Sequence, residues 1–378
     1  MIYADHAATT KISETAKLAM LSAMEKDWYN PSSLYTPGQQ ASGTLMDARV
    51  RIAHCLGCLP KEIYFTSGGS EADNQAILSA AAIGKRQGKM HIISTAFEHH
   101  AVLHTLKKLE KESFEITLLD VGEKGIVSPV QVEKAIRPDT ILVTVMYANN
   151  EIGTIQPIRE IGAICRKNGV LFHTDAVQAA GHLQINVEKD QIDMLSLSAH
   201  KFNGPKGIGV LYAKTGVFLT NLIEGGGQER GKRAGTENLP AIVGMVAALE
   251  EACSLQKERS IYVTKLRDQL IDGLKKIPGA LLNGDATNRL PGNVNFCFPD
   301  TEAEGLLLLL DNKGICASSG SACTSGFLDP SHVLLAIGRD PQTARGSLRL
   351  TLDYENTPEE VETIIEAVTD TVRILRGC

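Results

Sequence analysis

The chain has 378 residues, of which 43% are hydrophobic and 22% charged, proportions typical of a globular protein with a large buried core. Its formal net charge of −6 excludes a surface built throughout for nucleic acid, and no basic region followed by an apolar region opens the sequence. The leucine run from Leu306 to Leu310 is far shorter than the roughly 18–20 apolar residues of a membrane helix. We therefore expect a cytoplasmic protein of two domains, without direct contact to nucleic acid or membrane.

Helix and strand signals alternate through the first two thirds of the chain, starting with a helix over residues 13–26 that Ser13 caps. Strands are expected at residues 62–66, 91–94, 116–119, 140–146, 170–174 and 194–197. Helices are expected between them at residues 70–87, 101–112 and 158–167. This alternation predicts a mainly parallel sheet covered by helices on both faces, which binds ligands beyond the carboxyl ends of its strands.

The character of the sequence changes after Leu249, where a long, charged, amphipathic helix over residues 250–276 is expected to lead into a second domain. Thr357 starts the last helix strongly, because a proline and two acids follow this N-cap residue. Further strands are expected at residues 293–298 and 347–352, and further helices at residues 301–312 and 357–376. We expect a large domain over residues 13–250 and a small one formed by residues 1–12 and 251–378.

The chain has eight cysteines, which we do not expect to form a disulfide framework in a long chain without an export signal. Cys55 and Cys58 form a Cys-Leu-Gly-Cys motif that we interpret as packing at a helix end, with Gly57 supplying the turn. A zinc site is the alternative, although no second pair of ligands follows closely. We interpret four other cysteines as small hydrophobic residues and the terminal one as incidental: Cys165, Cys253, Cys297, Cys316 and Cys378.

Two segments that follow predicted strands carry groups suited to a charged ligand. Residues 65–71 end a strand and open a helix with two glycines and a hydroxyl, so that backbone N–H groups and the helix dipole could face an anion. The alternative is an ordinary glycine turn. In the segment of residues 172–178, Asp175 stands at the end of the expected strand. A buried acid there needs a partner such as a pyridinium nitrogen. Capping of the next helix is the alternative for Asp175.

Lys201 and Cys323 are the candidate covalent groups. Lys201 follows an apolar strand and lies next to Ser198 and His200, so it could form a Schiff base if its pKa is lowered, whereas the alternative is a solvated surface lysine. Cys323 lies in a segment rich in glycine, serine and threonine without apolar periodicity. This composition predicts an exposed, mobile loop and favours a reactive thiol over a small buried side chain.

In this order and spacing the motifs resemble those of the cysteine desulfurases, relatives of the class V aminotransferases with the fold type I architecture that binds pyridoxal 5'-phosphate (PLP). The resemblance covers essentially the whole chain. Besides the segments described above, it rests on residues 3–10 (YADHAATT), 29–33 (YNPSS), 98–102 (EHHAV), 149–153 (NNEIG), 225–230 (GGGQER) and 318–325 (SSGSACTS). It implies an α/β fold in which a seven-stranded, mainly parallel sheet with covering helices forms the large domain and a smaller α+β domain follows.

The resemblance also implies how the cofactor is held. Lys201 would bind it covalently, Asp175 would pair with the pyridinium nitrogen, and His99 would stack on the ring and could move a proton. Gln178 would hydrogen-bond the phenolic oxygen of the ring. The phosphate would be bound by Gly69, Ser70, Ser198 and His200, and by Thr236 of a neighbouring subunit, which implies a homodimer with active sites at the interface.

The substrate side of the resemblance concerns cysteine and its sulfur. Asn150, which is also an expected cofactor-binding residue, and Arg349 would receive the carboxylate of L-cysteine. The thiolate of Cys323 would take the sulfur as a persulfide and leave L-alanine, so that Lys201, Cys323 and His99 are the expected catalytic residues. No metal is expected, apart from a possible transient iron–sulfur contact at Cys323.

The chain departs from the family pattern at a few positions. His6 stands where relatives often carry Asn or Tyr, and Ser70 stands where many carry Thr, which keeps the hydroxyl. The segment after Cys323 is long, and the chain ends at Cys378 without the extension that some members use to dock an iron–sulfur scaffold. The sulfur acceptor is therefore expected to be either such a scaffold or a tRNA-thiolation enzyme. Three alternatives remain: a selenocysteine lyase, a class V aminotransferase, and a cofactor-free binding module.

Overall fold

Seven strands form the main sheet of this computed structural model, which describes residues 1–320 and 330–377. Their spatial order is β2-β8-β7-β6-β5-β3-β4. Strand β8 pairs antiparallel with both of its neighbours, and the other four pairings are parallel. The strands are β2 (Ile63–Thr66), β3 (His91–Thr95), β4 (Glu115–Leu119), β5 (Thr140–Thr144), β6 (Leu171–Asp175), β7 (Met194–Ser198) and β8 (Gly209–Ala213). The expected mainly parallel seven-stranded sheet is confirmed.

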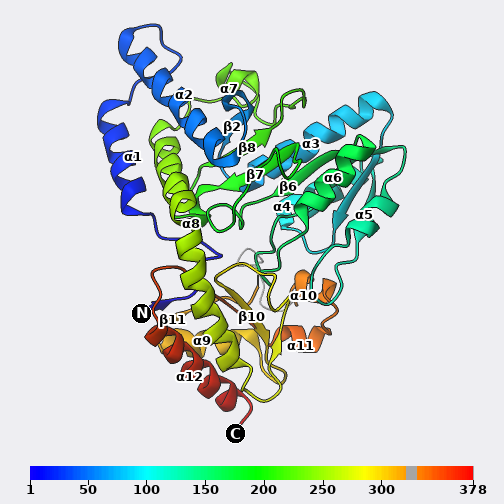
Figure 1. Cartoon of the computed structure of the whole chain (residues 1–378), viewed down its shortest axis with the longest axis vertical. Helices are drawn as coiled ribbons and strands as arrows, with labels where there is room; N and C mark the ends of the chain where they lie inside the picture. The colour runs from blue at the N-terminus through cyan, green and yellow to red at the C-terminus, as the bar shows by residue number, and fades with distance from the viewer. Residues whose placement is uncertain (321–329, 378) are drawn as a thin grey trace.

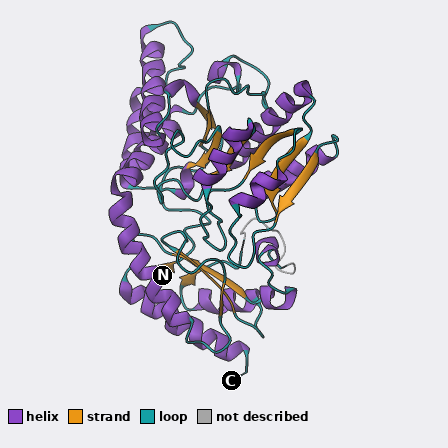
Figure 2. Cartoon of the chain, turned by 45° about the vertical axis from the view of Figure 1, so that its right-hand side comes forward, coloured by secondary structure: helices purple, strands orange, loops and turns teal. Residues whose placement is uncertain are grey.

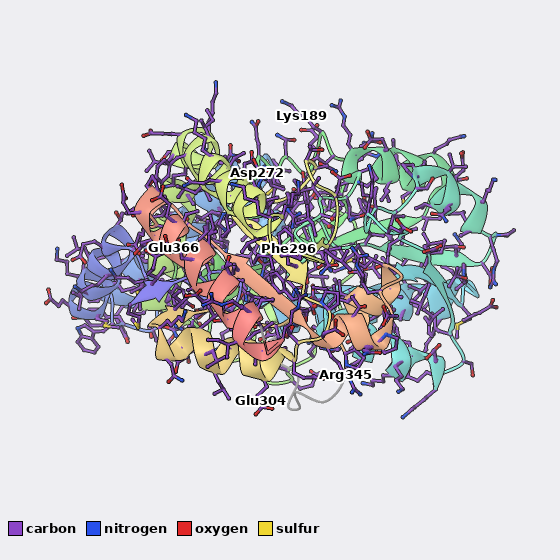
Figure 3. All side chains as sticks on the ribbon, turned by 90° about the horizontal axis from the view of Figure 1, so that it is seen from below. Lys189, Asp272, Phe296, Glu304, Arg345 and Glu366 are labelled. Carbon is purple, nitrogen blue, oxygen red and sulfur yellow. The ribbon has the colours of Figure 1, made fainter. Side chains whose placement is uncertain are left out.

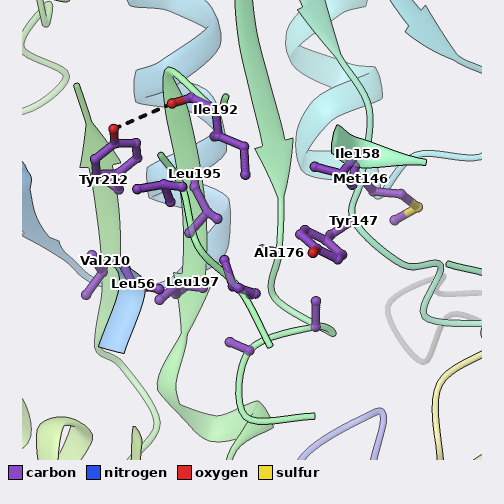
Figure 4. Packing of buried hydrophobic residues seen from close by; sticks show 14 of the residues in the cluster. Leu56, Met146, Tyr147, Ile158, Ala176, Ile192, Leu195, Leu197, Val210 and Tyr212 are labelled. Carbon is purple, nitrogen blue, oxygen red and sulfur yellow. Dashed lines mark hydrogen bonds between the residues drawn. The ribbon is translucent and has the colours of Figure 1, made fainter. Parts of the chain in front are cut away.

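Helices cover both faces of this sheet, as Figures 1 and 2 show. Successive side chains of a strand point to opposite faces of the sheet, so neighbouring strand residues belong to different hydrophobic clusters. Met194 packs among residues of α3 and α4, whereas Leu195 packs among residues of α2, α6 and α8. Figure 4 shows Leu195, Leu197 and Val210 in the second of these clusters. The covering helices are α1 (Glu14–Lys26), α2 (Thr36–Leu56), α3 (Gly69–Gln87), α4 (His100–Glu110), α5 (Pro129–Ala135) and α6 (Ile158–Asn168), and the short α7 is Gln228–Gly231.

A second, smaller sheet lies at the far end of the molecule and has the antiparallel order β12-β10-β9. Figure 3 labels Phe296 on β10, with Glu304 and Glu366 on the helices around it. The N-terminal strand β1 (Ile2–Tyr3) reaches this part of the chain and pairs with β11 (Ile315–Cys316). The other elements are β9 (Leu281–Leu282), β10 (Asn293–Cys297), β12 (Ser347–Thr351), α9 (Ala303–Asn312), α10 (His332–Ala336), α11 (Pro341–Arg345) and α12 (Pro358–Leu375).

The long helix α8 (Leu239–Leu274) runs from the main sheet down to the smaller one (Figure 1). The sequence prediction placed its start near residue 250, which is wrong by about three turns. Asn238 caps the helix by accepting a hydrogen bond from the backbone of Ala241, and the first turns are apolar on all sides because they are buried, so they show no helical periodicity. Within the described residues, α8 alone is long and apolar enough to cross a membrane, but it packs here as a core helix.

Several elements have weak sequence signals and were not predicted. Helix α2 has a proline as its second residue and contains Gly38 and Gly43, and β8 follows a glycine-rich segment. The predicted helix end near Cys55 is correct: α2 ends at Leu56, and Gly57 adopts a φ of 71°. The thiol of Cys55 interacts with Cys253 on α8, so the packing interpretation agrees with the structure better than a zinc site does.

Candidate active site

A cavity of about 210 Å³ opens beside the carboxyl ends of β6 and β7. Ligands of parallel sheets bind beyond the C-terminal ends of the strands. The cavity therefore lies at the edge of the sheet where the sequence predicted a site. The lining includes ten of the predicted residues: Gly69, Ser70, His99, Asn150, Asp175, Gln178, Ser198, His200, Lys201 and Arg349. It also includes Ala7, Ala8, Asp73, Met146, Ala148 and Val177, which were not predicted.

One end of the cavity is suited to an anion. Gly68 caps α3 without any side-chain hydrogen bond, and Gly69 and Ser70 in the first turn of this helix line the cavity, which therefore lies near the positive end of the helix dipole. A Cβ atom on Gly69 would lie 2.6 Å from Cγ2 of Val177, so glycine is required where the turn passes this side chain. Ser70 and Ser198 add hydroxyl groups to the same lining. A phosphate group fits this cradle.

His200 belongs to the same end of the cavity and is neutral near pH 7. Burial, assisted by the charge of Lys201, lowers its pKa to about 4. One ring nitrogen lies 3.1 Å from the hydroxyl of Thr9. The imidazole can therefore serve as a hydrogen-bonding group for an anion.

Lys201 is held in the cavity by the N-terminal segment of the chain. It ends a short 3-10 turn, Ala199–Lys201, directly after β7. Its Nζ atom donates to the carbonyl oxygens of Ala7 and Ala8, both at 2.7 Å. The backbone of Thr10 bonds the carbonyl of His200 at 2.9 Å, which ties the two segments together. The surface-lysine alternative is therefore wrong.

Asp175 ends β6 and is only 6% exposed. Its Oδ1 atom accepts the backbone N–H of Val177 at 2.9 Å, so part of the carboxylate does cap the following turn. Burial raises the pKa of Asp175, whereas the nearby His99 and Lys201 and the Val177 hydrogen bond act in the opposite direction. Asp175 lines the cavity, where a protonated ring nitrogen would be a suitable partner for its carboxylate.

His99 caps α4, and its Nδ1 atom accepts the backbone N–H of Ala101 at 3.1 Å. This bond places the ring proton on Nε2 in the neutral form. Burial lowers the pKa of His99, and the charge of Lys201 lowers it further, although Asp175 acts in the opposite direction. The ring therefore offers the cavity one N–H group.

Arg349 reaches the cavity from β12 of the smaller sheet. It is 1% exposed, and its Nη2 atom pairs with Asp5 at 2.8 Å. Nη1 donates to the carbonyl of Asn150 at 3.2 Å, whereas the buried Nε atom has no hydrogen-bond partner within the described residues. A buried guanidinium at the lining of a cavity is suited to a carboxylate ligand.

Two predicted site residues are not part of this cavity lining. Thr236 lines a separate hollow of about 60 Å³ together with Ser67 and Arg233. Cys323 lies outside the described residues, so its predicted position stays a prediction. The described residues before it are anchored close to the cavity, because Ser318 pairs with Arg349 through two backbone hydrogen bonds of 3.1 and 2.6 Å.

Asp73 is the site residue that the sequence analysis missed. It lies on the buried face of α3, is 1% exposed, and has an oxygen within 4.8 Å of ligand atoms of both His99 and Asp175. A signal was present in the sequence, since this acid stands on the same helix face as Ala72, Ala76 and Ala80. An acid within such an apolar face indicates a buried functional group.

The whole chain is similar to known proteins. The family model for class-V aminotransferases matches residues 2–364. The chain is 52% identical over 376 residues to "Cysteine desulfurase IscS" of Methanosarcina thermophila, covering 100% of this chain and 93% of that relative. It is 46% identical over 376 residues to "Putative cysteine desulfurase IscS 1" of Bacillus subtilis, covering 99% of both.

Solved structures have the same architecture. A structure titled "NIFS-LIKE PROTEIN" superposes with a TM-score of 0.92 at 36% identity and covers 99% of both chains. A structure titled "SspA in complex with cysteine" superposes with a TM-score of 0.82 at 36% identity, covering 94% of this chain and 100% of that one.

Proposed function

Because this chain belongs to the class-V aminotransferase family, we propose that it is a PLP-dependent cysteine desulfurase that converts L-cysteine to L-alanine. The observation that carries the proposal is the cavity in which an amine, a buried carboxylate and a buried guanidinium meet, contributed by Lys201, Asp175 and Arg349. Both named relatives and the cysteine-bound neighbour support this activity over a cofactor-free binding module.

The cavity fits PLP at each of its functional groups. Lys201 would hold the aldehyde carbon, Asp175 the ring nitrogen and Gln178 the phenolic oxygen. The cradle at Gly69 and the neutral imidazole of His200 would hold the phosphate, together with Ser70 and Ser198. When bound, PLP supplies an electron sink that stabilises negative charge on the substrate carbon.

The substrate carboxylate would bind at Arg349 and Asn150. Arg349 lines the cavity and already holds the carboxylate of Asp5, and its planar guanidinium is suited to a substrate carboxylate as well. Asn149 holds the turn that carries Asn150, because its amide donates to the carbonyl of Phe97 at 3.0 Å and accepts from the backbone of Glu151 at 2.8 Å.

Proton transfers would use His99 and Lys201. The neutral ring of His99 holds its proton on Nε2 and lines the cavity, next to Asp175. The amine of Lys201 can accept and return a proton once it no longer holds the cofactor. Neither group requires water in the pocket.

Sulfur would pass to the thiol of Cys323. The sulfur–sulfur bond forms as the carbon–sulfur bond of cysteine breaks, and the carbon keeps the electron pair and takes up a proton to give L-alanine. One thiol and one cysteine thus become one persulfide and one alanine, so no external oxidant is needed. The role of Cys323 rests on the motif in residues 318–325.

We infer the wider arrangement from the same resemblance. Thr236 lies apart from the cavity of its own chain and would reach the phosphate in a homodimer partner. The division into a large domain of residues 13–250 and a small domain of residues 1–12 and 251–378 follows the two sheets, with α8 shared between them. A cytoplasmic sulfur-acceptor protein, either an iron–sulfur scaffold or a tRNA-thiolation enzyme, would then receive the persulfide sulfur.

Mass spectrometry after incubation with L-cysteine tests the proposal. The peptide that carries Cys323 should gain one sulfur, about 32 Da, which a reducing thiol removes. Cys323→Ala should keep the visible absorbance of bound PLP and lose sulfide release, whereas Lys201→Ala should lose both. Cys253→Ala, a change of an exposed thiol away from the cavity, serves as the control and should release sulfide as the wild type does.

The outcome also separates the alternatives. Full sulfide release by Cys323→Ala would remove the persulfide step, and a requirement for a keto acid would favour an aminotransferase. Turnover of selenocysteine that survives Cys323→Ala, with cysteine turnover lost, would favour a selenocysteine lyase.

A further inference from the structure

Two carboxyl groups lie together in the lining of the cavity, one on α3 and one at the end of β6. Oxygen atoms of Asp73 and Asp175 lie within 4.8 Å of each other and of a nitrogen of His99. The side chains are 1% and 6% exposed, so solvent does not screen the pair. Two carboxylates at this separation in a buried site are not expected to be ionised together, which means that one of them holds a proton.

The surroundings of Asp73 favour its protonated form. Its Oδ1 atom is buried without a hydrogen-bond partner in the described part of the chain. Burial raises its pKa well above the usual range, and the charge of Asp175 adds to this effect. The hydroxyl of Ser196 acts in the opposite direction but carries no charge. An ionised Asp73 would therefore be a buried anion beside a second carboxylate.

His173 does not supply the missing positive charge. Its Nε2 atom is 3.6 Å from the orphaned oxygen of Asp73, but the ring is completely buried and burial lowers its pKa to about 3. Both ring nitrogens have other partners, Thr144 at 2.8 Å and Ser196 at 3.0 Å. The imidazole is thus neutral at physiological pH and does not form an ion pair with Asp73.

The surroundings of Asp175 favour its ionised form. It accepts a backbone N–H from Val177, and the field of Lys201 and His99 stabilises its negative charge. It also lines the cavity at the position where the cofactor ring would lie. Asp73 has neither a backbone donor nor a cation in the described part of the chain.

We propose that Asp73 is a positioning residue that holds the shared proton, so that Asp175 stands alone as the anion that faces the cofactor ring. The inference rests on the proposed function, because it concerns the charge that Asp175 offers to PLP. The polar set around the pair, Ser196, His173 and Thr144, keeps the site neutral on the side away from the cavity. The pair then carries one negative charge, which matches one protonated ring nitrogen.

Infrared difference spectroscopy of the whole protein tests this assignment directly. Protein with 13C-labelled aspartate should show the stretch of a protonated carboxyl at neutral pH, with and without PLP, and Asp73→Asn should lose it. The control is Asp193→Asn, a change of a partly buried aspartate that pairs with Lys214 at 3.4 Å, which should lose only a carboxylate band. Absence of a protonated aspartate band from the wild type would overturn the proposal, even if the variant failed to fold.

The spectrum of bound PLP provides the second readout. An asparagine amide is neutral and has the same shape as the protonated carboxyl that it replaces. Asp73→Asn should therefore bind PLP with a Kd within about twofold of that of the wild type. The pH midpoint of its visible band should also stay where it is. A shifted midpoint would show that an ionised Asp73 had been removed, and would overturn the proposal. If the wild type bound no PLP, the proposed function would fail, while the infrared result on the cofactor-free protein would still decide the state of Asp73.

Discussion

The cavity and the core beneath the smaller sheet are both buried, but they bury opposite kinds of side chain. The hydrophobic core beside the smaller sheet contains Phe296, Leu306 and Leu310 at 1% exposure or less. The wall of the cavity buries Asp73 and Asp175 next to imidazoles. Packing in the small core raises the free energy of unfolding. In the cavity, burial shifts the pKa values of the ionisable groups and thereby determines which of them are charged.

Arg349 breaks this division, since it extends from a strand of the small core into the cavity. Replacing it with alanine removes the carboxylate donor and leaves Asp5 without its ion pair. We expect kcat/KM for L-cysteine to fall about a thousandfold, and Arg349→Lys to recover only part of the loss because lysine lacks the planar fork.

Steady-state alanine formation measures this effect, and the exposed Arg373→Ala on α12 is the matched control. Wild-type kcat/KM in Arg349→Ala would show that the carboxylate binds elsewhere in the cavity.

A change inside the small core should affect stability far more than chemistry. Phe296 is 1% exposed and stacks on Phe298 with ring centroids 6.0 Å apart. Phe296→Ala should lower the free energy of unfolding by about 3–5 kcal/mol because it leaves a cavity in a packed core. Denaturant titration measures the loss. The same substitution at the partly exposed Phe218 should cost less than about 1 kcal/mol.

Glu98 should change how the free energy of unfolding depends on pH. This carboxyl is fully buried, and burial raises its pKa to about 8, although it accepts hydrogen bonds from Thr95 and Met146. Between the ordinary glutamate pKa and pH 8 the unfolded chain has lost the proton and the folded chain keeps it. The contribution is therefore complete at low pH and is lost as pH rises, by roughly 1.4 kcal/mol per unit.

Unfolding of the wild type and of Glu98→Gln between pH 5 and 8 measures this slope. The free energy of unfolding of the wild type, relative to that of Glu98→Gln, should fall steadily as pH rises. Parallel curves would mean that Glu98 is ionised in the folded protein at neutral pH.

The sequence predicted much of the site because the family motifs lie at strand ends, where parallel topology brings them together. Lys201 and Asp175 follow β7 and β6, which are neighbours in the sheet. Asp73 was missed because it occupies a helix face that looks like ordinary alanine packing. The start of α8 was missed for a related reason: a segment buried on every side has no periodicity to read.

By itself, the sequence determined which reactive groups the protein carries, where strands end, and which family the motifs resemble. Only the tertiary structure decided that Ala7, Asp73 and Arg349 share one cavity, and that a neutral His173 lies behind Asp73. The physical reason is that a residue type sets which charges are available, whereas burial and neighbours set the free energy of each charged form, and both come from contacts between segments far apart in the chain.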